Sequence, residues 1–232
     1  MIHSILKCLW GKQKNNRTLR KCLSTLYFLF QRNKRKIQGS NNKIAYDGAY
    51  LAKVTFDIVG NGNRILFKPG ARLSNVLIKM RGDRHTLVIG EDCIFGGGSF
   101  WFQTEGCEII VGGKTSFEEA NVSALEPHSR VAIGADCMFS YDVHIRNGDS
   151  HSIIDLETNK RINYAENICI GDHVWLGAHV QVLKGVTIES NSIVGIRSVV
   201  TSDIPKHSIA VGVPAKVKKR NIDWSRELIF DE

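Results

Sequence analysis

An aliphatic residue recurs at every sixth position in the C-terminal half of the chain. The first register of this repeat is Ile170, Leu176, Val182, Ile188, Val194 and Val200. A second register, two residues earlier, is Ile168, Val174, Val180 and Val186, continued by the small residues Ser192 and Ser198. A period of six fits neither an α-helix nor an alternating β-strand. It predicts a parallel β-helix, an all-β solenoid in which short strands and tight corners stack coil upon coil.

The repeat also predicts how the chain is divided. Before residue 147 it is less regular: Phe67, Leu73 and Lys79 keep part of it, whereas Ile89, Phe95 and Trp101, and later Ile133, Phe139 and Ile145, keep the period. The polar stretch 147–167 breaks the repeat and is predicted to be a loop, and long loops on rigid scaffolds tend to carry function. We therefore expect a β-helix domain over 46–205. A C-terminal segment over 206–232 should leave the solenoid and end in a short helix.

Positive charge is concentrated at the start of the chain. The 232 residues carry a net charge of +8, but eleven lysines and arginines precede the first acidic residue, Asp47. Residues 1–45 are therefore a basic segment, predicted to be helical with a linker at 38–43. This segment either packs on the domain or a neighbouring subunit, or it contacts an anionic membrane surface or anionic polymer. Because the rest of the chain is slightly acidic, we expect no nucleic-acid partner.

The cysteines indicate a reducing compartment. None of the six forms a Cys-x-x-Cys pair, and no convincing secretory signal precedes them. The apolar run 22–30 is about half the length of a membrane span. We interpret the chain as cytoplasmic, with the basic segment as a peripheral contact to the inner membrane as the alternative.

Two motifs resemble the hexapeptide-repeat acyltransferases. They are Gly171-Asp-His-Val-Trp-Leu-Gly177 and the closing Asp203-Ile-Pro205 with Val211-Gly-Val-Pro-Ala-Lys216, and the resemblance covers about 85–219. The segments 138–146, 149–151 and 161–163 are more closely similar to bacterial capsular polysaccharide and sialic acid O-acetyltransferases. The resemblance implies a left-handed parallel β-helix assembled as a homotrimer. It also implies transfer of acetyl from acetyl-CoA, without a metal, to a hydroxyl of a carbohydrate acceptor such as capsule or O-antigen. The left hand comes from the resemblance alone, since general chirality rules favour right-handed crossovers.

Acetyl transfer to a sugar hydroxyl needs a base, and histidine is the natural one near neutral pH. Among eight histidines, His151 lies in the predicted loop, two residues after Asp149 and 24 residues before Trp175. The resemblance implies that His151 is the base with Trp175 beside it. Asp149 either orients the imidazole or forms a local turn. Because Trp175 precedes the inward Leu176, its side chain should point outward and line the acceptor or thioester pocket.

The remaining candidates bind substrates. Asn121 matches the family position that contacts the acceptor sugar, and Asp142 and His144 either face the same cleft or are solvated. The resemblance places the pantetheine arm of acetyl-CoA along Gly177, Ala178 and Gly195, where small residues allow close approach. Basic groups for its phosphates are Arg197, Lys216 and Lys219. Ile196 and Arg197 stand where the family commonly has Ala and Gly, so the nucleotide end of the pocket should differ in shape.

Four other functions share this architecture. A small-sugar O-acetyltransferase of the galactoside or maltose type is the main alternative, and segment 146–163 argues against it. A nucleotide-sugar N-acetyltransferase is disfavoured because no nucleotide-binding domain precedes the coils. A γ-type carbonic anhydrase needs three metal-binding histidines, which His144, His151, His173 and His179 could supply, but Trp175 and the closing motif speak against it. A noncatalytic scaffold is disfavoured by the joint presence of His151, Trp175 and Asn121.

Overall fold

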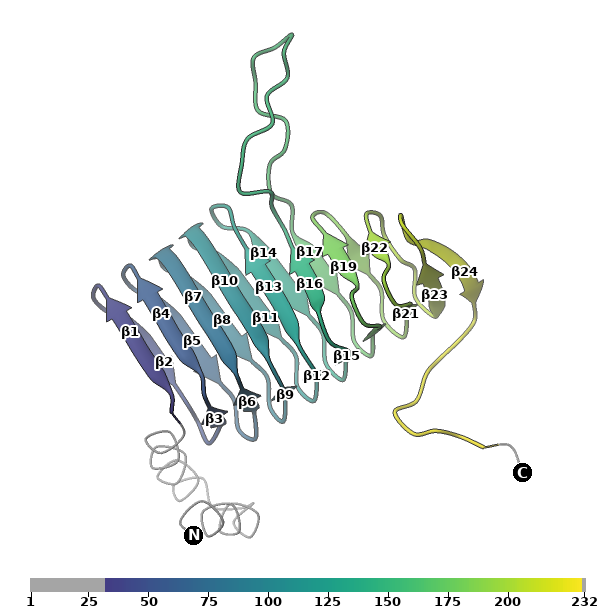
Figure 1. The fold of residues 1–232 in the computed structure, drawn as a ribbon, viewed down its shortest axis with the longest axis horizontal. Helices are drawn as coiled ribbons and strands as arrows, with labels where there is room; N and C mark the ends of the chain where they lie inside the picture. The colour runs from purple at the N-terminus through teal and green to yellow at the C-terminus, as the bar shows by residue number, and fades with distance from the viewer. Residues whose placement is uncertain (1–31, 231–232) are drawn as a thin grey trace.

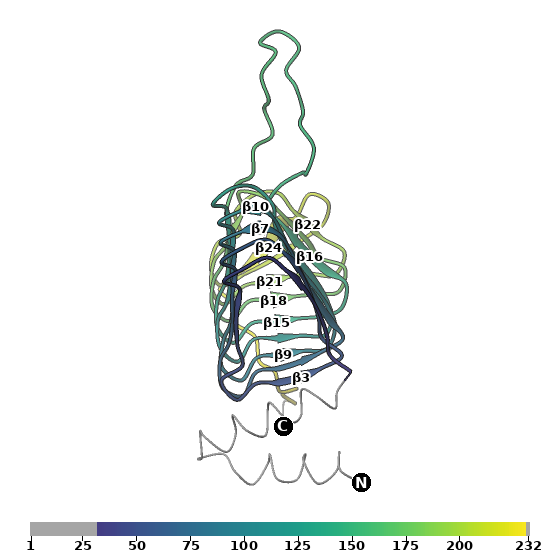
Figure 2. The same cartoon turned by 90° about the vertical axis from the view of Figure 1, so that its left-hand side faces the viewer.

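The chain folds into a stack of coils (Figure 1), which are triangular when seen end-on (Figure 2). The computed structural model describes residues 32–230, and this part is all-β, with no helix among its elements. Each full coil contributes one strand to each of three sheets, which we call A, B and C, and the coil is a left-handed parallel β-helix. The predicted solenoid is therefore confirmed. The basic segment was predicted to be helical over residues 1–45; residues 1–31 lie outside the described residues, and within 32–45 the chain forms strands at 34–38 and 43–45 instead of helix.

Sheet A contains β1 (Lys34–Gln38), β4 (Thr55–Val59), β7 (Val76–Asp83), β10 (Gly98–Glu105), β13 (Ala120–Ala124), β16 (Val143–Arg146), β19 (Gln181–Leu183) and β22 (Val199–Val200). Sheet B contains β2 (Lys43–Ala45), β5 (Arg64–Phe67), β8 (Thr86–Ile89), β11 (Glu108–Val111), β14 (Arg130–Ile133), β17 (Ile168–Ile170) and β20 (Thr187–Ile188). Sheet C contains β3 (Tyr50–Ala52), β6 (Arg72–Ser74), β9 (Ile94–Phe95), β12 (Ser116–Phe117), β15 (Met138–Phe139), β18 (Trp175–Leu176), β21 (Ile193–Val194), β23 (Ser208–Val211) and β24 (Lys216–Arg220). Every pairing between these strands is parallel except the antiparallel pair β23–β24.

The solenoid is longer at both ends than the repeat predicted. Strand β1 pairs with β4, so the coils begin at Lys34 instead of residue 46. All five residues of β1 are exposed, which is why this strand has no apolar period to recognise. At the other end β23 pairs in parallel with β21, and residues 221–230 contain no helix but follow an extended path.

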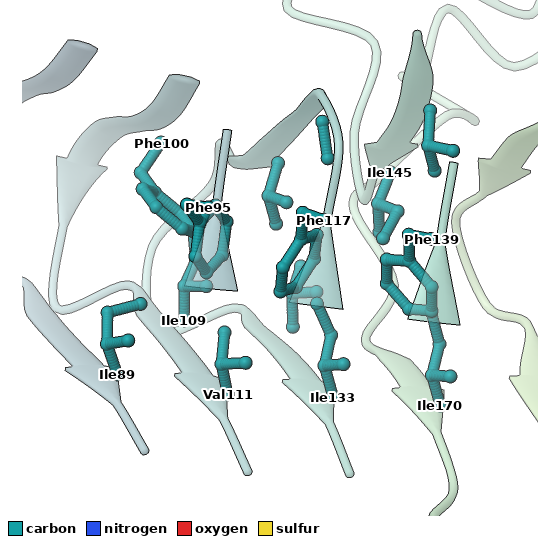
Figure 3. Close-up of a cluster of buried hydrophobic side chains, with 14 of the residues drawn as sticks. Ile89, Phe95, Phe100, Ile109, Val111, Phe117, Ile133, Phe139, Ile145 and Ile170 are labelled. Carbon is teal, nitrogen blue, oxygen red and sulfur yellow. The ribbon is translucent and has the colours of Figure 1, made fainter. Parts of the chain in front are cut away.

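Aromatic side chains from successive coils stack through the middle of the core (Figure 3). The ring of Phe117 stacks on Phe95 with centroids 3.8 Å apart and meets Phe139 edge-on at 4.8 Å. All three side chains are at most 2% exposed. The sequence register fails at Trp101, because Phe100 and Phe102 point inward in the eight-residue strand β10 and Trp101 points outward.

A long loop leaves the stack at one corner. Residues 147–167 connect β16 in sheet A to β17 in sheet B, and they project far beyond the coils (Figures 1 and 2). Cys93, Cys107 and Cys137 are buried, whereas Cys169 is exposed. Burial raises the pKa of the Cys93 thiol to about 11 and that of Cys137 to about 12. Between residues 32 and 230 no helix has the length and apolar character needed to cross a membrane.

Candidate functional site

The projecting loop is held together by Asn163. This side chain is buried, and its Nδ2 donates to the Asp149 carboxylate and to the His151 carbonyl oxygen, both at 2.8 Å. Its Oδ1 accepts a hydrogen bond of 2.7 Å from the Ile153 amide. One amide side chain thus joins the two limbs of the loop and fixes the backbone of His151.

Two arginines clamp the base of the loop to the coils. Arg161 pairs with Glu126 through both guanidinium nitrogens, with Nη1 3.2 Å from Oε2, and it also donates to the Asn163 carbonyl at 2.9 Å. Such two-point pairs are among the stronger polar contacts in proteins. Arg146 at the end of β16 donates to the Gly148 carbonyl at 2.8 Å and to Ser150 Oγ at 2.7 Å.

The candidate base and its neighbour have different environments. His151 is exposed, as expected for a group that must reach substrate. The Asp149 carboxylate accepts hydrogen bonds from Lys184 Nζ at 2.6 Å and from Asn163. The bond from Lys184 is the main reason that the pKa of Asp149 is lowered. In this structure Asp149 therefore anchors the loop to the coil below through Lys184.

A polar pocket of about 180 Å³ lies on the outer face of sheet A, next to the base of the loop. We call it the sheet A pocket; its lining residues are Asn121, Ser123, His144, Arg146, Gln181 and Leu183. Asn121, His144 and Gln181 are neighbours in register on β13, β16 and β19. The fold thus brings together the predicted acceptor residues Asn121 and His144. It also places Gln181 beside them, a residue that nothing in the sequence repeat had indicated.

Asp142 fixes the imidazole of His144. Its carboxylate is 2.9 Å from His144 Nε2 and 2.7 Å from His179 Nδ1, and His179 Nε2 is 3.2 Å from the Tyr141 hydroxyl. The hydrogen bonds from His179 and then His144 lower the pKa of Asp142. Asp142 therefore acts on the sheet A pocket indirectly, by orienting His144. Between residues 32 and 230 no three histidine, cysteine or acidic side chains converge in a way that could hold a metal ion.

Trp175 lies on a different side of the coil. It belongs to β18 in sheet C, points outward as predicted, and is 36% exposed. It lines a cavity of about 370 Å³, which we call the sheet C pocket; the other lining residues are Ile94, Ser116, Phe117, Glu118, Met138, Phe139 and Ser140. The loop leaves from the corner between sheets A and B, the one corner that sheet C does not share. Within a single chain His151 and Trp175 are therefore on opposite sides of the triangle.

The candidate donor residues are gathered at the C-terminal end of the stack. A Cβ at Gly177 would lie 2.8 Å from the Ile196 nitrogen, and one at Gly195 would lie 2.6 Å from Val211 Cγ1. Coil packing thus requires glycine at 177, where the contact is with backbone, whereas at 195 a Cβ would need the Val211 side chain to move; Ala178 is buried. Arg197, Lys216 and Lys219 are exposed, so their charges are accessible to an anionic ligand.

Comparisons with known proteins find similarity to acetyltransferases that are named for polysialic acid. No family model matches the chain. It is 33% identical to a polysialic acid O-acetyltransferase of Neisseria meningitidis, over 82% of the chain and 89% of that protein. It is 38% identical to a polysialic acid O-acetyltransferase of Escherichia coli O1:K1 / APEC, over 56% of the chain but only 43% of that protein.

Two solved structures resemble it over most of their length. The polySia-specific acetyltransferase NeuO has a TM-score of 0.75 and 32% identity, over 84% of the chain and 89% of that structure. The polysialic acid O-acetyltransferase OatWY has a TM-score of 0.68 and 28% identity, over 86% of the chain and 94% of that structure.

Proposed function

The chain belongs to the hexapeptide-repeat O-acetyltransferases, near those named for polysialic acid, and we propose that it acetylates a hydroxyl of an acidic bacterial surface polysaccharide with acetyl-CoA as donor. The observation that carries this proposal is the placement of His151. An exposed histidine stands on a loop that Asn163 and two arginines hold rigidly, and a polar pocket lies at the base of that loop. A site for general base catalysis needs such a held, accessible group.

The proposed chemistry uses His151 as the proton carrier. The acceptor oxygen attacks the carbonyl carbon of the thioester, and its proton passes to the His151 imidazole. The carbon–sulfur bond then breaks, and the same proton is available to the departing thiolate. His151 thus ends each cycle neutral, and neither a metal nor a redox partner is needed for the atoms to balance.

The sheet A pocket is suited to bind the acceptor sugar. Asn121, His144 and Gln181 offer amide and imidazole groups, which match the hydroxyl groups of a carbohydrate. Positive charge beside the pocket suits an acidic sugar, because Arg146 and Lys79 flank the Trp101 ring at 5.8 and 5.2 Å from its centre. An aromatic ring between two cations gives a sugar both an apolar face and a partner for its carboxylate.

Completion of the site requires a second copy of the chain. His151 and Trp175 face different sides of one coil, so we propose that the loop of one copy reaches the sheet C pocket of its neighbour in a homotrimer. The donor then lies along the C-terminal coils, with Arg197, Lys216 and Lys219 available to its phosphates. The use of acetyl-CoA and the buried free thiols favour a cytoplasmic place of action.

A thiol-release assay tests the proposal. Purified protein is given acetyl-CoA with long acidic polysaccharide, with short neutral sugars or with no acceptor. We expect acceptor-dependent thiol release only with the acidic polysaccharide, and we expect His151→Ala to lower it by about 10²- to 10⁴-fold with the fold intact. Release with galactosides or maltose instead would point to a small-sugar enzyme. No release with any acceptor would contradict the proposal, as would near-normal turnover in His151→Ala.

A further inference from the structure

The end of the chain forms a strap along the corner between sheets B and C. This strap, Asn221–Arg226, runs back from the coil of β23 toward β12. His207 Nδ1 is 3.1 Å from the Ile222 carbonyl, and His173 Nε2 is 3.0 Å from the Trp224 carbonyl. Arg226 donates to Asp136 Oδ1 at 3.1 Å and to Ser116 Oγ at 2.9 Å. The strap is thus bonded to side chains of four coils, although the repeat has ended.

Trp224 connects the strap to the sheet C pocket. Its ring stacks on His173 with centroids 4.0 Å apart and planes 9° apart, and its Nε1 donates to the His173 carbonyl at 2.8 Å. Only 9% of Trp224 is exposed, and its ring centre is 6.0 Å from that of Trp175. Ser116, which Arg226 holds, also lines the pocket. The strap therefore supports two residues of that pocket from one side.

The hydrogen bonds of His173 require a charged imidazole. Its Nδ1 lies 2.8 Å from Asp136 Oδ2, and its Nε2 lies 3.0 Å from the Trp224 carbonyl oxygen. A neutral imidazole carries one N–H, and a carboxylate and a carbonyl can only accept. Both bonds form together only when both ring nitrogens are protonated. Loss of the proton breaks one of them, either the bond to the coil below or the bond to the strap.

The charges around His173 favour the protonated form. Asp136 faces it from the coil of β15, Asp223 faces it from the strap with Oδ1 3.5 Å from Nε2, and Arg226 binds the far oxygen of Asp136. Burial opposes protonation of His173. The bonds to Trp224 and Asp136 outweigh that effect and raise its pKa. A group whose pKa is raised on folding stabilises the folded arrangement at low pH and stops doing so as pH rises through the raised value.

We propose that His173, Trp224 and Arg226 form a proton-dependent latch that holds Trp175 in place at the sheet C pocket. The latch is closed while His173 is protonated and opens when it loses its proton. Its three members are positioning residues, since they act through Trp175 and touch no reacting atom. The inference rests on the proposed function only for the role of Trp175, because the strap and its hydrogen bonds are observed in the structure whatever the function is.

Limited trypsin digestion of the full-length protein tests the latch without using activity. Cleavage after Arg220 and Arg226 is followed by mass spectrometry from mildly acidic to alkaline pH, and the ratio between variants at each pH cancels the protease's own pH dependence. We expect His173→Gln to be cleaved about tenfold faster than wild type at low pH, which is what one hydrogen bond to a charged group is worth. At high pH the cleavage rates of His173→Gln and wild type should become equal. His207→Gln is the matched control, because His207 has one strap bond and should leave the pH dependence unchanged.

An activity measurement tests the positioning role. The latch predicts that wild-type activity declines as pH rises and His173 loses its proton. Trp224→Ala should lower kcat/KM about tenfold at low pH, the same worth of one hydrogen bond to a charged group, and should abolish that decline, whereas Trp224→Phe should restore both. A constant ratio of His173→Gln to wild-type cleavage at all pH values would overturn the latch, whether or not the enzyme is active. If that ratio does change with pH but Trp175→Ala keeps full activity, then His173 still controls attachment of the strap, and the proposed role of the latch in positioning Trp175 for catalysis is overturned.

Discussion

Replacing Asn163 with alanine tests how the loop holds the proposed base. The substitution removes the two 2.8 Å bonds to Asp149 and the His151 carbonyl, the 2.7 Å bond from Ile153 and a longer bond of 3.2 Å from Arg161 Nε. Arg161 keeps its pairing with Glu126, so the loop stays attached at its base. The coils below are untouched, because Asn163 contacts the loop and not the core. The expected effect is therefore local.

The magnitude follows from the bonds lost. The three shorter bonds are each worth about 1 kcal/mol net, so the ordered loop is destabilised by about 3 kcal/mol. A change of about 1.4 kcal/mol is a factor of ten, which sets an expected fall in kcat of up to about a hundredfold. That fall is also what about 1 Å of misplacement of a catalytic group typically costs. The KM for acetyl-CoA should change little, because its candidate contacts lie on other coils.

The assay is steady-state thiol release with acidic polysaccharide, together with thermal unfolding of the same samples. Asn159→Gly is the matched control: Asn159 lies near the loop tip at a φ of 52°, a conformation that glycine also accepts. We expect the control to keep wild-type turnover and both variants to keep the wild-type Tm. Turnover within a factor of two of wild type in Asn163→Ala would refute the reasoning, because it would show that His151 does not need this support.

Three further outcomes are expected. In Lys184→Met the pKa of Asp149 should return toward its ordinary value; since a lowered pKa stabilises the fold only above that pKa, the fall in Tm on acidification should begin at higher pH, and an unchanged Tm–pH profile would contradict the role of Lys184. Deletion through residue 45 removes β1 and β2 and should lower Tm. If the basic segment attracts the polymer, rising salt should reduce wild-type activity on acidic polysaccharide toward that of a variant lacking residues 1–31, and equal salt responses would exclude this. Phe117→Ala should lower the free energy of unfolding by about 3–5 kcal/mol in denaturant titration, while Phe230→Ala, at an exposed position, should change it by less than about 0.5 kcal/mol.

The repeat predicted the C-terminal coils well because their geometry is regular. Leu176, Val182, Ile188, Val194 and Val200 are all 0% exposed, as their recurrence at the same inward position on each side of the triangle requires. In the N-terminal half the strands of sheet A reach eight residues, so a coil contains more than three hexads. Inward positions then follow the alternation within each strand. This is why Trp101 lies on the outer face although it keeps the sixfold spacing.

The loop was predictable from the break in the period, but the contacts that hold it were not. Lys184 is 35 residues from Asp149, and Glu126 is 35 residues from Arg161. No repeat and no spacing rule identifies either pair in the sequence, because each pair joins a coil to a loop whose path the sequence does not specify. The same holds for Trp175 and His151: their separation in one coil is a consequence of topology, which the spacing of 24 residues does not encode.

The corner residues explain why the strap lies where it does. Asp136, His173, Asn191 and His207 occupy successive corners between sheets B and C, each with a positive φ between 53° and 60°. Asp, Asn and His are the non-glycine residues that adopt this conformation most readily, so the corner itself selects polar side chains. Stacking the coils lines these side chains up along one edge, and an extended segment can bind to them without entering the core. The polar corners that allow the solenoid to turn thus also provide the attachment points for the strap, and substituting them with glycine should preserve the coils while releasing residues 221–226.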